Sequence, residues 1–571
     1  MNDIEQRIAK LSPEKRQLLE AKLLAKRINQ NALIDYKRYA ADNPGILSSS
    51  QLRFWFLDRF EPENSVSNIP MLLKLNGALD IPKLEWAISS IVARHGALRT
   101  TFQGEDDQPV QIVADADVVS LERLDGVNTA TQFSCRPFDL KVGPLARFGL
   151  LQVENQQHWL LVVMHHMISD GWSLNLFQAE LVNLYTGNEQ ALPSLKAQYS
   201  DFASWQKMRE PLLERQIDYW RKILDSSAGV LDLPVDRPRP KQRSYAGARF
   251  KTIIPGELRN ALQSSGNQNQ ATLFITLLTT LNILLARYSG KRDISIGSPV
   301  AGRNHTDFEN VIGVFINTIV LRNDLSGEPS FLEQLNRVRE VTLDAFSNQE
   351  IPFEKLIERL QPERNIGHSP FFQVMLVLQN QTLAPNKMGD IQIEREFVEM
   401  GTSLFELTFI VQPRDDGLHL TVEYSTEIFE HQTISRLVGH WKIIMEAAIN
   451  SPNTSIWDLP MLSEDERAVV LEASNIDASY RSPQLSSSEG AISEAQRAPD
   501  AADPNFRPND LDNVPEPGRI NDLFHHQALH VPDAVALSLN GSSMSYRELA
   551  GHVNRLANHL RKMGIRPNDL V

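Results

Sequence analysis

A short apolar segment that ends in two histidines places the strongest constraint on how this chain folds. The segment HWLLVVMHH (158–166) is bounded by polar residues, a pattern typical of a strand buried in a packed domain. An Asp-Gly pair, Asp170 and Gly171, follows where the chain must turn away from that strand. The sequence therefore predicts a buried strand with ionisable side chains at its end.

The chain of 571 residues alternates strand-like and helical patterns over most of its length. The segments RDISIGSPVAGR and VIGVFINTIVLR contain predicted strands, whereas PSFLEQLNRVREVTLDAFSN and TISRLVGHWKIIMEAAI have the periodicity of amphipathic helices. Because the length exceeds that of one ordinary core, this mixture predicts an α/β body of two lobes, 44–220 and 221–465.

Three further regions lie outside this predicted body. Residues 1–40 contain a helix start at Ser12 and Pro13, so they form either a helix packed on the body or a docking element for an upstream subunit. Residues 466–518 form a predicted linker, because positions 475–518 are rich in Ser, Pro, Asp, Asn and Ala and poor in large apolar residues. Strand and helix patterning resumes over 519–571.

Charge and cysteine content exclude several classes of site. The formal net charge of −14 gives no general attraction for nucleic acid or for anionic lipid. Cys135 is the single cysteine, so neither an internal disulfide nor a cysteine-based metal cluster can form. The N-terminus is charged throughout, and no apolar run approaches the roughly 18 residues of a membrane span. We expect a cytoplasmic protein that binds neither nucleic acid nor membrane.

The segment MHHMISDGWS (164–173) carries the candidate chemistry. His166 is expected to leave the strand end with its ring facing a cleft, where a neutral imidazole can take a proton from an amine or hydroxyl. His165 faces the other way on the strand and is the better candidate for a core histidine, so the pair is a poor metal site. Asp170 shapes the turn, and Gly171 permits a backbone geometry that other residues resist.

The pattern HHxxxDG resembles the motif of the chloramphenicol-acetyltransferase-like superfamily, which includes acyltransferases, condensation domains and epimerization domains. Further segments are similar, in order, to the motifs of condensation domains from non-ribosomal peptide synthetases: LSSSQLRFWFL (47–57), ARHGALRTTF (93–102), MHHMISDGWS (164–173), YSDFASWQ (199–206), IGVFINTIVLR (312–322), NQEIPFEKL (348–356) and RNIGHSPFFQVM (364–375). The second has Gly96 where an acidic residue is usual, and the last lacks the family's second arginine.

The resemblance implies two acetyltransferase-like lobes arranged as a V-shaped pseudo-dimer, with a two-mouthed tunnel at their junction. It implies that His166 removes or orients the proton of an attacking amine, and that the Gly171 N–H is a donor for the oxyanion. The tunnel is expected to be lined by Trp172, Ser173 and Asn317. The structural partner expected for buried Asp170 is Arg303, which is favoured over Arg99; Arg94 and Arg99 are either further supports or solvated charges.

The resemblance also implies partners and cofactors. A donor acyl or peptidyl thioester is expected on the phosphopantetheine arm of an upstream carrier protein, on a separate subunit if Met1 is the native start. The acceptor amine is expected on a downstream carrier. The segment 519–571 resembles the opening of an adenylation domain but stops before any phosphate loop, and no covalent cofactor or metal is expected in this chain.

Three alternatives stay open at the level of sequence. An epimerization domain shares HHxxxDG, and proton exchange at the α-carbon distinguishes it. A free acyltransferase accepts coenzyme A thioesters without a carrier protein. A catalytically silent docking platform organises carriers only, and the intact His-Asp-Gly set is evidence against it.

Overall fold

The computed structural model describes residues 39–40, 44–60, 64–104, 109–126, 128–224, 231–240, 243–362, 369–379, 384–469, 533–539, 542–549 and 551–553. The chain divides into two compact units, Met1–Met461 and Leu462–Val571. The helix predicted within 1–40 and nearly all of the predicted linker at 466–518 lie outside the described residues.

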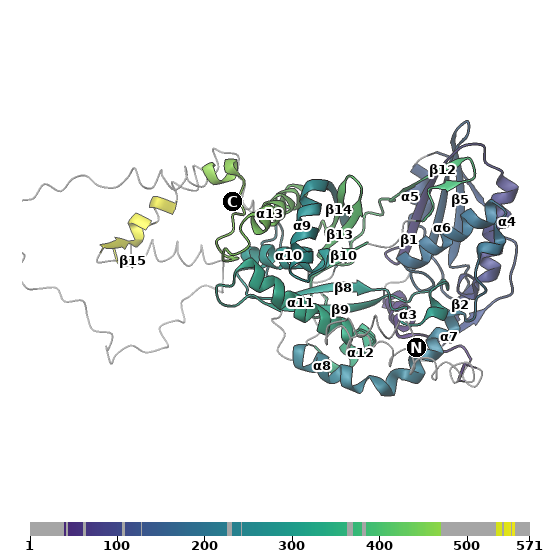
Figure 1. Cartoon of the computed structure of the whole chain (residues 1–571), viewed down its shortest axis with the longest axis horizontal. Coiled ribbons are helices and arrows are strands. Elements are labelled where there is room, and N and C mark those ends of the chain that lie inside the picture. Colours follow the sequence, from purple (N-terminus) through teal and green to yellow (C-terminus); the bar gives the residue numbers. More distant parts are fainter. Residues whose placement is uncertain are drawn as a thin grey trace, which may run out of the picture. The chain divides into compact units, whose positions relative to one another are not determined.

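The first unit contains two lobes, and the sheet of the first lobe is centred on the apolar segment of the sequence (Figure 1). The strand order is β11-β12-β1-β6-β5-β4. Strand β6 (Gln157–His165) is antiparallel to β1 (Asn68–Asn76) and to β5 (Ala146–Glu154), and β4 (Glu122–Leu124) closes one edge in parallel with β5. The predicted buried strand is confirmed, and it ends at His165.

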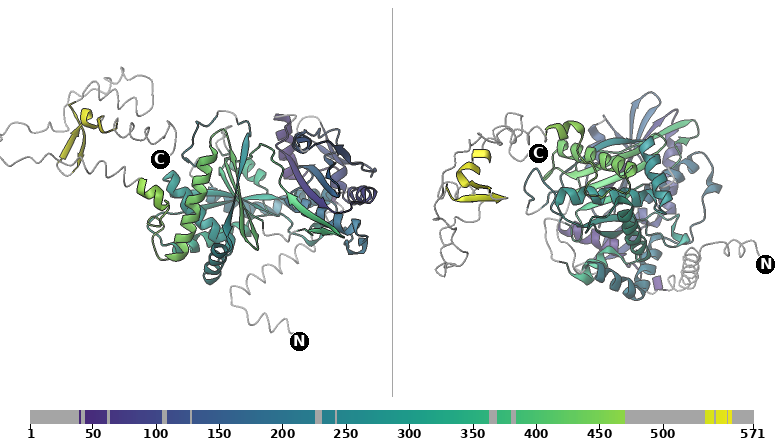
Figure 2. Two further views of the ribbon diagram at one scale, coloured as in Figure 1. Left: turned by 90° about the horizontal axis from the view of Figure 1, so that it is seen from above. Right: turned by 60° about the vertical axis from the view of Figure 1, so that its left-hand side comes forward.

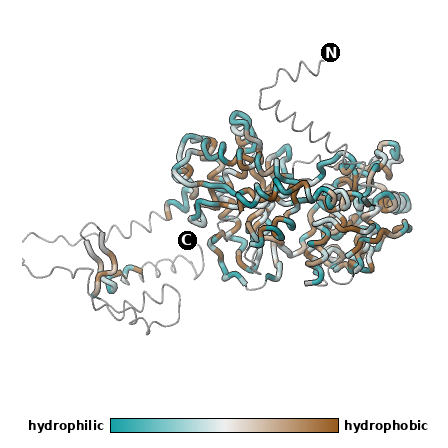
Figure 3. Tube along the Cα trace, turned by 90° about the horizontal axis from the view of Figure 1, so that it is seen from below, coloured by the Kyte–Doolittle hydropathy of each residue, from teal (hydrophilic) through white to brown (hydrophobic). Residues whose placement is uncertain are grey.

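Strand β6 is apolar throughout because both of its faces are covered. Leu160, Val162 and Met164 belong to the large core that includes residues of α4 (Ile81–Arg94) and α6 (Gly171–Tyr185). Leu161 and Val163 face a smaller cluster on the other side, which includes residues of α5 (Asn128–Cys135). Figure 3 shows the hydrophobic residues (brown) along such inner segments. A strand covered on both faces has no polar alternation, which is what the sequence shows.

The sheet of the second lobe has the order β7-β14-β13-β10-β8-β9. Strand β10 (Val374–Leu378) is parallel to both of its neighbours, and the remaining pairs are antiparallel. The other strands are β7 (Gly247–Pro255), β8 (Asp293–Val300), β9 (Asn317–Asp324), β13 (Leu407–Arg414) and β14 (Gly417–Ser425). The helices that pack on this lobe (Figure 2) include α9 (Gly256–Gln268), α10 (Leu273–Ser289), α11 (Phe331–Ser347) and α13 (His431–Asn450).

The lobes exchange segments, so they are not continuous in the sequence. Strands β11 (Lys387–Met388) and β12 (Ile391–Glu396) follow most of the second lobe along the chain but pair in the first sheet, where β12 lies against β1. The connection between β8 and β9, residues 301–316, also inserts Phe308, Ile312 and Phe315 into the core of the first lobe. The predicted boundary at 220/221 therefore does not separate the two lobes.

Two glycines allow the 301–316 connection to pack closely. Gly302 has a φ of +64°, and a Cβ built there lies 1.8 Å from the carbonyl oxygen of Phe315. A Cβ on Gly313 would lie 2.0 Å from the ring of Tyr199 in α7 (Tyr199–Arg209). Since a side chain at either position overlaps another group, glycine is required for the close approach.

The second unit contains a described antiparallel pair of strands, β15 (Val535–Leu539) and β16 (Ser542–Ser545). This agrees with the strand patterning expected over 519–571.

Among the described helices none alone is long and apolar enough to span a membrane, and only α9 and α10 together, bent by 103°, pass on length and composition.

We predict that Gly302→Ala lowers the free energy of unfolding by roughly 3 kcal/mol or more, because left-handed strain of about 1–2 kcal/mol adds to displacement of a backbone carbonyl. Gly187→Ala is the matched control, since Gly187 also has a left-handed φ of +77° but meets nothing within 4 Å. For Gly187→Ala, the loss of unfolding free energy should stay near the left-handed strain of about 1–2 kcal/mol. Urea unfolding followed by tryptophan fluorescence measures both, and equal losses would contradict the close approach at Gly302.

Candidate active site

His166 lies just beyond β6, at the first position of the turn that leads to α6. Its backbone N–H donates to the Ser67 carbonyl at 2.7 Å, which holds the turn against the start of β1. The side chain is partly exposed, while its Nδ1 atom is buried and has no hydrogen-bond partner among the described residues. The structure therefore places a partly accessible imidazole at the strand end.

The imidazole of His166 stacks on the ring of Phe54, a residue of α3 (Ser49–Phe60). The ring centroids are 5.0 Å apart and the planes differ by 19°. Phe54 and Trp55 are buried in the core, whereas Phe56 is 37% exposed.

Burial is the largest influence on the His166 imidazole and lowers its pKa from the ordinary value of 6.5. The Asp170 carboxylate and the nearby carbonyls of His166 and Ser169 act in the opposite direction, and the charge of Arg53 lowers the pKa further. The net effect is a pKa below its usual range. At neutral pH the imidazole is therefore uncharged, as a proton acceptor must be.

His165 is a buried core residue, as the strand geometry predicts. It is 4% exposed, and its Nδ1 accepts a hydrogen bond from the Met167 N–H at 3.1 Å. Burial, together with the charges of His166 and Arg147, lowers the pKa of His165 to about 3. A buried ring that is neutral at neutral pH and accepts a hydrogen bond within the turn supports the strand end and has no access to a substrate.

Asp170 is the N-cap of α6 and is almost completely buried. Its Oδ1 accepts from the Ser173 N–H at 2.8 Å, and its Oδ2 accepts from the Phe315 N–H at 2.9 Å. The first bond begins a helix of the first lobe, and the second fixes the inserted connection 301–316. One carboxylate therefore joins the histidine turn to a segment of the second lobe.

The cation next to Asp170 is Arg303, whose Nη2 lies 3.5 Å from Oδ1. Shorter hydrogen bonds run from the guanidinium to the carbonyls of Phe308 and Val311, both at 2.6 Å, and to the Ser173 hydroxyl at 2.9 Å. Burial lowers the pKa of Arg303, while Asp170 raises it. Arg303 therefore holds the 301–316 connection in place through two of its carbonyls. It also compensates the charge of the buried Asp170 carboxylate.

Gly171 and Ser173 differ from the expectations for them. Gly171 is not among the residues with positive φ, and a Cβ there would meet nothing within 4 Å, so no unusual backbone geometry requires this glycine. Ser173 was expected to line a tunnel but is completely buried. Its hydroxyl donates to the Gly313 carbonyl at 2.8 Å and accepts from Arg303, so it is a structural link.

Trp172 and Asn317 also have structural contacts. The Trp172 indole N–H donates to the Glu309 carbonyl at 3.1 Å, and the ring lies beside Arg303. The Asn317 amide donates to the carbonyls of Gln349 and Ile351, both at 2.8 Å, and accepts from a backbone N–H at the start of α12 (Phe353–Leu360). Its polar atoms are therefore occupied by the turn before α12.

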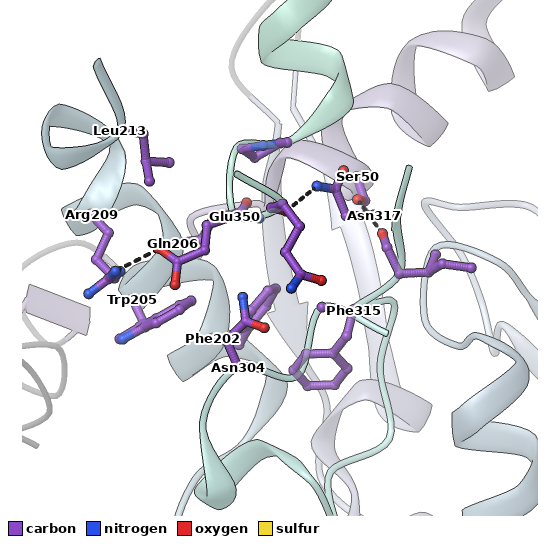
Figure 4. A pocket seen from close by; sticks show the side chains of 14 residues that line it. Ser50, Phe202, Trp205, Gln206, Arg209, Leu213, Asn304, Phe315, Asn317 and Glu350 are labelled. Atoms are coloured by element: carbon purple, nitrogen blue, oxygen red, sulfur yellow. Dashed lines mark hydrogen bonds and ion pairs between the residues drawn. The ribbon is translucent and has the colours of Figure 1, made fainter. Parts of the chain in front are cut away.

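Asn317 does line a pocket with about 460 Å³ of empty space (Figure 4). Residues of both lobes line it: Ser50, Trp205 and Arg209 from the first, and Asn317 and Glu350 from the second. Arg209 and Glu350 form an ion pair of 2.8 Å across the lobes. His166 is not among the lining residues. The two-mouthed tunnel around His166 stays a prediction.

Arg99 and Arg94 lie away from Asp170. The Arg99 guanidinium donates to the carbonyls of Val92, Ala93 and Ala114, which satisfies the end of α4. Arg94 pairs with Glu180 of α6 at 3.1 Å. Both arginines therefore stabilise helices of the first lobe.

Sequence reasoning missed His95, which is fully buried between the two segments that meet at Asp170. Its Nε2–H donates to Glu180 at 3.0 Å, and its Nδ1 accepts from the Ile312 N–H at 3.2 Å. Its place in ARHGALRTTF, between residues already singled out, was the available signal. Within the described part of the chain, no group of three or more His, Cys, Asp or Glu side chains is arranged to hold a metal.

Comparison with known proteins identifies a matching family and similar synthases. Residues 43–471 match the family model described as Condensation domain. The chain is 36% identical over 97% of its length to one of the linear gramicidin synthase proteins of Brevibacillus parabrevis, and 34% identical over 91% to bacitracin synthase 3 of Bacillus licheniformis. It spans only 11% and 8% of those two proteins.

A solved structure agrees with the fold. The X-domain in the complex of the X-domain and OxyB from teicoplanin biosynthesis has a TM-score of 0.67 and 27% sequence identity. The match covers 74% of this chain and 97% of that one. The expected α/β class with two paired lobes is therefore confirmed.

We predict that Arg303→Met destabilises the first unit by about 3–5 kcal/mol, because it leaves the Asp170 carboxylate buried without a cation. Adding Asp170→Asn should recover part of that loss by removing the uncompensated charge. Urea unfolding of the two single variants and the double variant measures the coupling.

Arg237→Met is the control for loss of an ion pair as such, because Arg237 and Glu430 pair at 2.6 Å with side chains 50% and 55% exposed. It should cost about 1 kcal/mol or less. Equal losses for Arg303→Met and Arg237→Met would show that Asp170 does not need its cation.

Proposed function

The chain belongs to the condensation domain family, and from this membership and the geometry of its site we propose that His166 handles the amine proton during amide bond formation. Condensation domains form amide bonds in non-ribosomal peptide synthetases, where they work with carrier and adenylation domains. The observation that carries the proposal is a partly exposed, neutral imidazole at the end of β6, in a turn that Asp170 anchors from both lobes.

In the proposed step, the acceptor's α-amine attacks the carbonyl carbon of the donor thioester. The C–N bond forms, the C–S bond breaks, and the sulfur leaves as the thiol of the donor carrier. His166 takes or orients the proton that the amine nitrogen loses, a contribution of roughly 10²–10⁴-fold. Holding two tethered reactants together contributes at least as much when their geometry is productive.

The oxyanion donor that we propose is the backbone N–H of Gly171, at the first position of α6. This N–H has no partner among the described residues, and the space where a side chain would stand is open. The N-terminal end of a helix favours negative charge. The absence of a Cβ leaves room for an approaching carbonyl.

The proposed reactants arrive on partner proteins. Relatives of this kind use phosphopantetheine on carrier domains. We assign the donor to an upstream carrier and the acceptor to a downstream carrier, and we propose that the segment 519–571 belongs to an adenylation domain. The proposed step needs no covalent cofactor or metal in this chain. A cytoplasmic location of the protein stays a prediction.

The central prediction is that His166→Ala lowers amide formation by about 10²–10⁴-fold while the fold survives, since the ring makes no hydrogen bond that the described structure depends on. Mass spectrometry of product from loaded donor and acceptor carriers measures it. His158→Gln on the same strand is the control and should keep normal turnover. Activity with an acyl-coenzyme A donor, or proton exchange at the α-carbon, would instead favour one of the related activities.

We also predict that the acid limb of kcat/KM that belongs to His166 lies below pH 6.5. The pKa of His166 is lowered in the folded protein, so the imidazole stays neutral until the pH falls through that lowered value, and activity is lost there. The acceptor amine titrates too, so the profile is repeated with an acceptor whose amine pKa is lowered by a β-fluoro substituent. The His166 limb should not move; a His166 limb centred above 6.5 would contradict the neutral base.

A further inference from the structure

The stacked pair of Phe54 and His166 joins two segments that are far apart in the sequence. Phe54 lies in α3, and His166 lies in the turn after β6. Their ring planes are within 19° of parallel at a centroid distance of 5.0 Å, inside the range at which offset-stacked rings attract each other. The contact therefore restrains the plane of the imidazole and covers one of its faces.

No hydrogen-bonded side chain competes for that role among the described residues. Catalytic histidines are commonly oriented by a carboxylate or carbonyl on the second ring nitrogen. Here the Nδ1 of His166 is buried without a hydrogen bond, and the nearby Asp170 carboxylate is occupied by the N–H groups of Ser173 and Phe315. Among the side chains around the ring, packing therefore has to orient the imidazole, in addition to the nearby carbonyls of His166 and Ser169.

We infer that Phe54 is a positioning residue for His166, whose flat contact fixes the plane of the imidazole in place of a hydrogen-bonded carboxylate. The stack itself is a property of the fold, and its importance for turnover rests on the proposed function. Phe54 touches neither the reactants nor the proton. It acts through His166.

Phe54 can serve this purpose because its own position is fixed. It is 9% exposed and belongs to the core of the first lobe, and its ring also meets the His165 ring at 6.1 Å with an angle of 78°. The preceding residue, Arg53, pairs with Glu354 of α12 at 3.5 Å. Helix α3 is thus held by its own lobe and by a contact with the second.

A phenyl ring also suits a neutral base. It offers no hydrogen-bond donor or acceptor, so it does not compete with the amine for a ring nitrogen. Replacing the ring by an aliphatic side chain keeps an apolar neighbour but removes the flat contact, and the imidazole then samples other ring planes. The expected result is a lower kcat with little change in KM.

The kinetic test compares Phe54→Leu, Phe54→Tyr and the wild-type chain with loaded carriers. Loss of a stacked pair corresponds to about a 3- to 10-fold reduction in kcat for Phe54→Leu, and the aromatic ring of Phe54→Tyr should restore most of it. The control is Phe177→Leu, since Phe177 is fully buried in the same core and stacks on Phe148 at 5.7 Å and 15°. It should leave kcat near the wild-type value. Equal kcat losses for Phe54→Leu and Phe177→Leu, or no recovery in Phe54→Tyr, would overturn the inference.

A second readout does not depend on activity. A phenyl ring stacked on an imidazole shields its carbon-bound protons, so the wild-type chain should show upfield-shifted His166 ring signals, assigned by their loss in His166→Gln. The shift should persist in Phe54→Tyr and relax in Phe54→Leu. If the His166 signals of the wild-type chain are shielded but Phe54→Leu keeps its kcat, only the positioning role is refuted. If the signals are shielded but the wild-type chain forms no amide, the proposed function is refuted. Unshielded wild-type signals would refute the stack.

Discussion

The buried carboxylate of Asp170 is the interaction on which the arrangement of the site depends. One oxygen caps α6 through Ser173, and the other holds the backbone of Phe315, which the second lobe contributes to the core of the first. Because an uncompensated carboxylate is strongly unfavourable in an apolar core, Arg303 must accompany it, and Arg303 lies on the same inserted connection. The turn that carries His166 forms correctly only when both lobes are in place.

This arrangement separates structural support from proton transfer. Asp170 makes no hydrogen bond to the imidazole, although its charge opposes the loss of basicity that burial causes. His165 and His95 are buried in hydrogen-bonded positions that hold backbone segments. His166 is the partly exposed histidine of the turn, and its ring plane is set by Phe54. The chemistry is left to one imidazole within a rigid frame.

The sequence predicts much of this because the decisive signals are local. The apolar segment 158–166 identifies the central strand, and HHxxxDG with the ordered motifs identifies the fold class and the family. The strand exchange was not predictable, since β1 and β12 pair across more than 300 residues with no local pattern. Ser173 and Asn317 were expected at a tunnel because their motifs pointed there, but motifs do not show which polar atoms are already satisfied. Phe54 lies in the motif 47–57, but its contact with His166 arises only from tertiary packing.

The proposed step requires an uncharged imidazole at the end of β6 at neutral pH. The most direct test is ¹⁵N NMR of the histidine-labelled chain titrated from pH 8 to pH 5, with the His166 signals identified from the His166→Gln spectrum. We expect that His166 has the nitrogen shifts of a neutral ring at pH 7 and gains its proton only below pH 6.5. An imidazolium at pH 7 would contradict it, because a protonated ring cannot accept the proton of an amine.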